Sequence, residues 1–399
     1  MHFQSFPFEQ DQSQAFLFSF YRTYDVLLYS NLSSSSSFQS LQMHKIRSQY
    51  PILDKYTYLN TANHGLISQE LIDYRINVME QMRDQASLYT NTRNVFIDEV
   101  RSTIAQFVDA TIENTAVIPN FSTGFNTLIE GIDKQSKFLL LDGDYPSVNW
   151  PVETRGFNCV YASINENLES NIKIACEQHE PDIFCFSVVQ YISGIKIDLE
   201  FVKQLKDQFP EMVIIGDLTQ YVGTERFRFR ESGLDIILAS CYKWLNAGDG
   251  NAFICVKERV KELIKPNRIG YRSTKNVINA IPEFIGRFEP GHQDMIAFGS
   301  LKLAIEVVLK IGLDKIQNEL QHWSEMAKVE FESRGLLEEA VVNRKQHSTI
   351  FNIKGSHDLY NKLLNHGVIT SLRGDGIRVS FSYFNDNKDF ARLLEVLDL

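Results

Sequence analysis

The stretch "SCYKWLNAGDGNAF", residues 240–253, places a lysine between two large aromatic residues at the end of an apolar run. The "NAGDGN" that follows has the composition of a loop, so Lys243 does not stand on an ordinary exposed helix. A lysine held among aromatic rings at a strand end can have a lowered pKa and act as a nucleophile or a base. The aromatic neighbours and the position at a strand end therefore indicate that Lys243 takes part in a reaction.

Polar and aromatic side chains also stand at the ends of other apolar runs. Asp217 ends "VIIGD", Ser240 ends "DIILAS", and Tyr145 follows "KFLLLDGD". Singly, each has an ordinary interpretation, because carboxylates and hydroxyls cap helices and tyrosines pack. Ser122 and Thr123 follow "AVIPN" and open a helix, where hydroxyls and free N–H groups can bind an anion such as phosphate.

The elements that must position these residues are short strands alternating with helices. Seven apolar runs bounded by turn residues predict buried strands: "TAVIP", "KFLLLD", "NCVYAS", "DIFCFSVV", "MVIIGD", "DIILAS" and "AFICVK". Helical patterns such as "TGFNTLIEGI" and "LEFVKQLKDQF" separate them. Strands buried on both faces predict an α/β domain with a mainly parallel seven-stranded sheet, whose ligands bind at the carboxyl ends of the strands.

The residue types at those ends match what pyridoxal phosphate requires. Lys243 supplies an amine for a Schiff base, and Asp217 supplies a carboxylate for the pyridine nitrogen. Tyr145 supplies a ring to stack on the cofactor. The predicted donors to the phosphate are Ser122, Thr123, Ser240 and Tyr242.

From about Tyr56 to its C-terminus, the chain resembles the class V aminotransferase family of fold-type-I pyridoxal phosphate enzymes, which includes cysteine desulfurases and kynureninases. The resemblance is carried by "DLTQ", which begins at Asp217, and by Lys243, which follows 26 positions later. The text "YKWLNAG" is especially similar to the kynureninase form of the lysine motif. The resemblance implies a large cofactor-binding domain and a smaller α+β C-terminal domain.

The resemblance also implies roles for further residues. Gln220 would lie near the ring oxygen of the cofactor, and Gln190 lies in a segment that lines it. Arg378, in "GDGIRVSFSYF", would bind the α-carboxylate of the substrate, which suits a planar guanidinium. Asn63 and His64, in "YLNTANHGL", are candidates for the substrate pocket.

Two features depart from the family pattern. Gly291 is followed by His292, where the family carries Gly-Thr and contacts the phosphate of the neighbouring subunit in a homodimer. A histidine can still donate that hydrogen bond. No cysteine follows Cys255, so the sulfur-accepting cysteine of the desulfurases is missing and desulfurase activity is not expected.

The domain organisation follows from composition and from the resemblance. Residues 1–42, with a five-serine run, are predicted to be a disordered tail or upstream sequence from a non-native start, with a targeting segment as the alternative. Residues 43–59 are expected to pack on the small domain. The large domain is predicted over 60–290 and the small domain over 291–399.

Composition limits the classes of partner and compartment. The formal charge of −10 is spread without long single-sign blocks, which argues against nucleic-acid and anionic-membrane binding. The five cysteines are an odd number with no C-x-x-C, which indicates reduced residues of a cytoplasmic protein, without a metal site. The expected partners are a small amino acid or keto acid and a second copy of the chain.

The sequence thus predicts a pyridoxal phosphate-dependent aminotransferase acting on an amino acid through Lys243. A kynureninase-like lyase that cleaves a side chain at Cβ is one alternative. A protein that keeps the fold without turnover is another, although it would have no chemical need for Asp217 and Lys243 together. Other pyridoxal phosphate chemistry, such as epimerisation, stays open.

Overall fold

The computed structural model describes residues 45–274 and 283–399 of the chain. The tail predicted over residues 1–42 lies outside these residues. Within the described part, no helix is long and apolar enough to cross a membrane.

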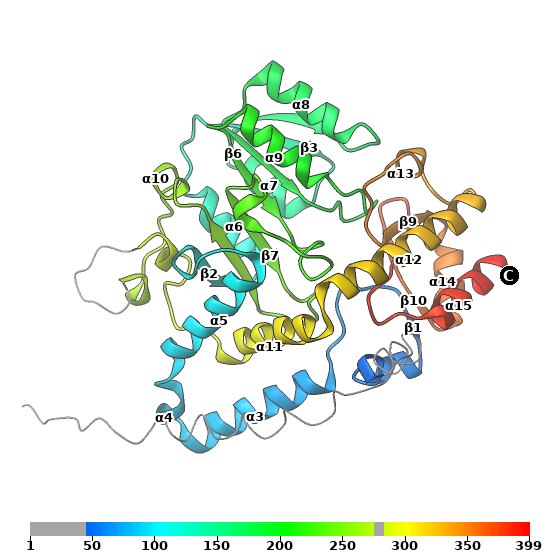
Figure 1. The fold of residues 1–399 in the computed structure, drawn as a ribbon, viewed down its shortest axis with the longest axis horizontal. Coiled ribbons are helices and arrows are strands. Elements are labelled where there is room, and N and C mark those ends of the chain that lie inside the picture. Colours follow the sequence, from blue (N-terminus) through cyan, green and yellow to red (C-terminus); the bar gives the residue numbers. More distant parts are fainter. Residues whose placement is uncertain (1–44, 275–282) are drawn as a thin grey trace, which may run out of the picture. The chain divides into compact units, whose positions relative to one another are not determined.

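All seven predicted strands form, and they lie in one sheet (Figure 1). The strands are β2 (Thr115–Ile118), β3 (Lys137–Asp142), β4 (Asn158–Ser163), β5 (Ile183–Ser187), β6 (Val213–Asp217), β7 (Ile236–Ser240) and β8 (Ala252–Val256). Their order is β2-β8-β7-β6-β5-β3-β4, and only the pairs that include β8 are antiparallel. The mainly parallel α/β sheet predicted from the sequence is therefore confirmed.

The sheet separates two apolar cores, because successive side chains of a strand point to opposite faces. In β3, Leu139 and Leu141 join one buried cluster, whereas Phe138 and Leu140 join the other. The same alternation holds in the neighbouring strands. Burial on both faces explains why these strands read as continuous apolar runs in the sequence.

Helices cover both faces of the sheet. One core includes apolar residues of α5 (Arg93–Val108), α8 (Leu168–His179), α9 (Leu199–Gln208) and α11 (Met295–Ile311). The other includes residues of α6 (Phe121–Ile129), α7 (Pro146–Glu153) and the short α10 (Val260–Leu263). Asn120 begins α6 by accepting a hydrogen bond from the Thr123 N–H at 2.8 Å. This cap fixes the first turn of α6 beside the strand ends.

A smaller β-structure follows in the C-terminal part of the chain, to one side of the main sheet in Figure 1. Its sheet has the order β11-β12-β9, with β9 (Ile350–Lys354), β11 (Ser371–Arg373) and β12 (Gly376–Ser380). The accompanying helices are α12 (Leu313–Ser333), α13 (Glu339–Val342), α14 (His357–Asn365) and α15 (Asn387–Asp398).

The segment before residue 60 contacts this C-terminal part. Strand β1 (Thr57–Tyr58) pairs in parallel with β10 (Val368–Ile369), and Arg47 forms an ion pair with Asp389 of α15 at 2.7 Å. The helix α3 (Gln69–Gln85) and the short α4 (Ser87–Thr90) follow. The hydroxyl of Tyr74 on α3 donates to the carbonyl of Met295 at the start of α11. The division of the chain at residues 60 and 291 stays a prediction.

Candidate active site

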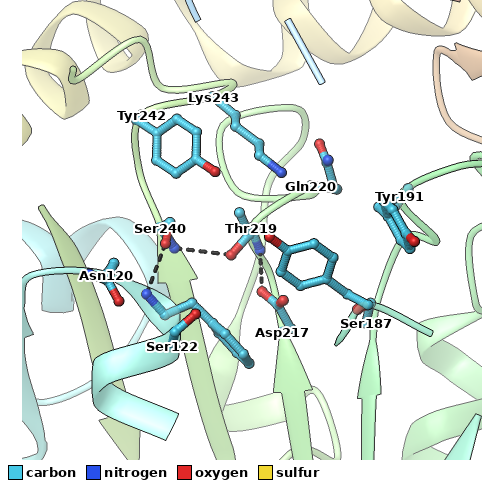
Figure 2. Close-up of a pocket in the computed structure, with 13 residues that line it drawn as sticks. Asn120, Ser122, Ser187, Tyr191, Asp217, Thr219, Gln220, Ser240, Tyr242 and Lys243 are labelled. Carbon is cyan, nitrogen blue, oxygen red and sulfur yellow. Dashed lines mark hydrogen bonds between the residues drawn. The ribbon is translucent and has the colours of Figure 1, made fainter. Parts of the chain in front are cut away.

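A cavity opens at the carboxyl ends of the parallel strands β5, β6 and β7 (Figure 2). It holds about 500 Å³ that protein atoms do not fill, part of which is open to solvent. The lining residues are Asn120, Phe121, Ser122, Tyr145, Ser187, Val189, Tyr191, Asp217, Thr219, Gln220, Ser240, Tyr242 and Lys243. The structure therefore brings together seven residues that the sequence singled out: Ser122, Tyr145, Asp217, Gln220, Ser240, Tyr242 and Lys243.

Lys243 projects into this cavity from the loop after β7, and its residue is only 6% exposed. Its Nζ lies 5.8 Å from the centre of the Tyr145 ring and 5.6 Å from that of the Tyr242 ring. Burial lowers the pKa of Lys243, and the positive charge of Arg378 lowers it further. The amine is therefore held in a state that favours the neutral, nucleophilic form.

Asp217 ends β6 and is buried at the base of the cavity. One carboxylate oxygen accepts a hydrogen bond from the Thr219 N–H at 2.8 Å. Burial raises the pKa of Asp217, whereas its hydrogen bonds to Thr219 and the charge of Lys243 oppose that rise. A buried carboxylate of this kind suits a cationic partner inside the cavity.

Hydrogen bonds tie the end of β7 to the first turn of α6. The Ser240 hydroxyl accepts from the Phe121 N–H at 2.9 Å, and the Ser240 N–H donates to the Thr219 hydroxyl at 3.0 Å. The Ser122 hydroxyl donates to that of Ser147 at 2.9 Å. The helix N-terminus and its hydroxyls thus face the cavity, an arrangement that can hold a phosphate. Thr123 is not among the lining residues, and its N–H is taken by the Asn120 cap.

A second set of hydrogen bonds fixes the side chain of Gln220. Its amide oxygen accepts from the Trp244 indole N–H at 2.8 Å, and its amide nitrogen donates to the Ala62 carbonyl at 2.8 Å. The aromatic neighbour that follows Lys243 in the sequence therefore holds a polar residue of the cavity. This contact also ties the segment around Ala62 to the strand ends.

Asp144, which the sequence did not single out, joins the ends of β3 and β5. Its two carboxylate oxygens accept from the N–H groups of Tyr145 and Ser187, each at 2.7 Å. The residue is buried and sets the backbone that carries the Tyr145 ring. The edge of that ring meets the Tyr191 ring at a centroid distance of 5.1 Å.

Arg378 lies outside the cavity lining but close to it. It is 2% exposed, and its Nη1 donates to the Tyr191 carbonyl at 2.8 Å. Its Nε has no hydrogen-bond partner in the described part of the chain. Burial, followed by the charge of Arg373, lowers the pKa of Arg378 to about 10. A buried guanidinium with an unused donor can bind an entering carboxylate.

The other predicted residues are not in the lining of the cavity. Gln190 accepts from the N–H groups of Ile192 and Ser193, both at 2.6 Å, so it shapes a turn. His64 lies 5.6 Å from Tyr242 between ring centres. His292 is exposed, and its predicted contact involves a neighbouring subunit.

Asn63 accepts a hydrogen bond from Arg373 at 2.8 Å. Arg373 is the basic residue that sequence reasoning missed. It stands five positions before Arg378 across "GDG", a turn signal that predicts a hairpin and could have revealed the pair.

The remaining lining residues that sequence reasoning did not assign to the site are Asn120, Phe121, Ser187, Val189, Tyr191 and Thr219. Each lies within a few positions of a strand end, so position after a strand was the available signal.

These residues fit pyridoxal phosphate. Ser187 presents a buried hydroxyl with no hydrogen-bond partner in the described structure, and it lines the cavity. The amine of Lys243, the carboxylate of Asp217 and the ring of Tyr145 all line the same space. An amine, a carboxylate, a ring and a helix N-terminus are the groups that this cofactor needs.

Comparison with known proteins agrees with this chemistry. Residues 66–393 match the sequence model of the family described as Aminotransferase class-V. An uncharacterized aminotransferase of Schizosaccharomyces pombe is 24% identical over 333 residues, which cover 75% of this chain and 81% of that protein. A kynureninase of Saccharomyces cerevisiae is 25% identical over 171 residues, 37% of each chain.

A solved structure confirms the fold. The apo structure of a cysteine desulfurase from Thermococcus onnurineus NA1 superposes with a TM-score of 0.77 at 16% identity, over 89% of this chain and 97% of that one. The family match spans most of the sequence and includes Lys243, Asp217 and Arg378. The chain therefore belongs to the class V aminotransferase family of pyridoxal phosphate-dependent enzymes.

Proposed function

We propose that this chain is an aminotransferase that takes an amino acid as substrate, with Lys243 as its catalytic residue. The observation that carries the proposal is the buried amine of Lys243, which shares one cavity with the buried carboxylate of Asp217 while Arg378 offers an unused donor at its edge. The relative of 24% identity that is named an aminotransferase supports it.

The side chains of the cavity divide the work. Arg378 binds the substrate carboxylate and so orients the Cα–H bond toward Lys243. The neutral amine of Lys243 removes that proton and returns it at a different atom, which is the proton movement that transamination requires. Pyridoxal phosphate, when bound, supplies an electron sink for the electrons left at Cα.

The other residues hold the cofactor and tune it. Asp217 would keep a proton on the pyridine nitrogen, and the Tyr145 ring would stack on the cofactor. Ser122, Ser240 and the first turn of α6 would hold the phosphate, with Tyr242 as a further donor. Gln220 would contact the cofactor, and Gln190 would shape the turn beside it. Because burial keeps water away from the charged groups, each of these interactions is stronger than it would be in solution.

A kynureninase-like lyase is the second candidate. The "YKWLNAG" stretch favours it, and kynureninases are among the relatives of the chain. In a lyase the same Lys243 would act, but the bond broken after proton removal would join Cβ to the side chain. Persulfide chemistry is not part of the proposal, because the lining contains no cysteine and the sequence has none beyond Cys255.

The proposal includes a homodimer in the cytoplasm. The predicted reach of His292 to a neighbouring subunit supports the dimer, since His292 is exposed in the single chain. Unpaired cysteines support a reducing compartment, because all five are free.

The test is the visible absorption spectrum of the purified protein with pyridoxal phosphate, followed by a panel of amino acids. Transamination converts the bound cofactor to pyridoxamine phosphate and releases a keto acid, both measurable by mass spectrometry. A lyase instead returns the original spectrum and releases a side-chain fragment. Absence of any cofactor band would overturn both candidates.

A further inference from the structure

Two arginines lie on the same face of the C-terminal hairpin formed by β11 and β12. Ser371 pairs with Arg378 and Arg373 pairs with Gly376 in the antiparallel register. Residues two apart on a strand share a face, so Arg373 is the diagonal neighbour of Arg378. Diagonal neighbours are within reach of long side chains, and Gly376 puts no side chain between the two guanidinium groups.

Neither guanidinium has an anionic partner. Arg378 contacts the Tyr191 carbonyl, and Arg373 donates to the Asn63 side chain at 2.8 Å and to the Leu372 carbonyl at 3.0 Å. Among residues 45–274 and 283–399, no carboxylate lies within ion-pair distance of either arginine. Like charges placed side by side repel each other, so this arrangement favours a bound anion.

Both arginines are linked to the cavity of Lys243. Tyr191, which holds Arg378, lines that cavity. Asn63, which holds Arg373, follows Ala62, whose carbonyl accepts from the lining residue Gln220 at 2.8 Å. The charges of Arg378 and Arg373 both lower the pKa of Lys243, so both act across the same space.

The two arginines differ in depth. Arg378 is buried, whereas Arg373 is exposed at the tip of the hairpin, where Gly374 lies against Ile192. An amino acid that places its amine at Lys243 and its α-carboxylate at Arg378 would extend its side chain toward the outer side. The exposed guanidinium of Arg373 is the second cation available to a substrate held in this way.

We infer that Arg373, oriented by Asn63, forms a second anion subsite and that the substrate is a dicarboxylic amino acid of the aspartate or glutamate type. This inference rests on the proposed function, because it assumes an amino acid whose α-carboxylate binds Arg378. Arg373 is the residue that determines specificity, since its charge pairs with the side-chain carboxylate.

The test compares substrates that differ only in charge. For the holoenzyme, kcat/KM is measured with aspartate against asparagine and with glutamate against glutamine. Within the preferred pair, kcat/KM for the acid is expected to be about 10- to 100-fold higher than for the amide. This factor is the usual contribution of a hydrogen bond to a charged group. In Arg373→Gln the ratio of the two kcat/KM values is expected to fall toward one, while kcat/KM for the amide stays unchanged.

Two further variants sharpen the result. Asn63→Asp places a carboxylate within hydrogen-bond distance of Arg373, so it is expected to remove the preference for the acid as Arg373→Gln does. Arg392→Gln removes a partly exposed arginine of α15, which pairs with Glu395, and serves as the control, with the ratio unchanged. If Arg373→Gln lowers kcat/KM equally for acid and amide, Arg373 binds the α-carboxylate and the inference is overturned.

A binding measurement separates this inference from the proposed function. Calorimetry on the cofactor-loaded protein compares succinate, a dianion, with butyrate, a monoanion of similar length. Succinate is expected to bind about tenfold more tightly to the wild type and no more tightly than butyrate to Arg373→Gln. If this binding result is found but no amino acid is turned over, the proposed aminotransferase activity is wrong and the anion subsite at Arg373 is supported. Equal binding to the wild type would overturn the subsite, even if neutral amino acids are transaminated.

Discussion

The strand-end cavity and the C-terminal hairpin differ in how their charges are paired. At the strand ends, Asp217 and Lys243 line one cavity. The N–H groups of Thr219 and Ser240 donate hydrogen bonds there, and the Asp144 carboxylate accepts one from the Ser187 N–H. On the hairpin, Arg373 and Arg378 stand together without a carboxylate in the described structure. In the first region a carboxylate stands near the lysine, whereas the second has two cations and no described anion. Under the proposals above, the strand ends bind the cofactor and the hairpin selects the substrate.

The substitution Lys243→Ala is the strongest test of the role given to the strand-end cavity. We expect loss of the visible band of the bound cofactor and a fall in kcat of at least about 10³-fold, because both nucleophile and base disappear. Absorption spectroscopy and steady-state kinetics check it. Lys388→Ala, an exposed lysine of α15, is the control that should keep both. A band that persists in Lys243→Ala would contradict the assignment.

On the hairpin side, Arg378→Ala is expected to raise KM for an amino acid by about 10- to 100-fold, since a charged hydrogen bond to the carboxylate is lost. The cofactor band should stay, because Lys243 and the residues proposed to hold the cofactor remain in place. Arg378→Lys should recover only part of the loss, because an ammonium cannot make the bidentate contact. An unchanged KM would remove the carboxylate role.

Gly65 packs against the loop that carries Lys243 and offers a third test. A Cβ at this position would lie 2.0 Å from the Lys243 carbonyl oxygen and 2.5 Å from the Asn246 side-chain oxygen. Gly65→Ala is therefore expected to lower the free energy of unfolding by about 1–3 kcal/mol, as overpacking does. Chemical denaturation of the cofactor-free protein measures it. Gly291→Ala, where a Cβ would meet no atom within 4 Å, should change little.

The charge of the hairpin is also expected to act on the cavity through pH. Burial and the charge of Arg378 lower the pKa of Lys243, so its amine is neutral at a lower pH than an exposed lysine. In the cofactor-free protein, carbamylation of Lys243 by cyanate should therefore begin at lower pH than that of a lysine in a short unstructured peptide. In Arg378→Gln the pKa rises and the midpoint moves to higher pH. Mass spectrometry of the modified peptides measures the midpoint of carbamylation in the wild type and in the variant. Equal midpoints for Lys243 and the reference lysine in the wild type would contradict the lowered pKa of Lys243.

The smallest effect on activity is expected from the hydrogen bond between Trp244 and Gln220. Trp244→Phe keeps the ring and removes the indole hydrogen bond to Gln220. The expected cost is about 1 kcal/mol of stability, with a change of only a few-fold in kcat/KM. A double-mutant cycle with Gln220→Ala isolates the contact. A coupling energy of zero would show that this hydrogen bond does not hold Gln220.

The sheet and the centre of the site could be predicted because their signals are local. Strands buried on both faces appear as unbroken apolar runs, and Asp217, Ser240 and Lys243 stand at or just beyond the ends of such runs. Parallel strands place their carboxyl ends at one edge, so residues that follow different runs meet without further information. The contact between Asp144 and the end of β5 did not follow from this reasoning. It depends on β3 lying beside β5 while β4 takes the edge, and chain order does not give that order in space.

The sequence by itself determined the fold class and the cofactor, and it predicted that Lys243 and Asp217 serve that cofactor. Only the tertiary structure decided which arginine stands beside Arg378, because that depends on the register of β11 against β12. It also decided that Asn63 holds Arg373, a contact between residues 310 positions apart. Apolar burial is a property of each segment and can be read along the chain, whereas a polar contact between distant segments forms only when packing brings both groups to one place.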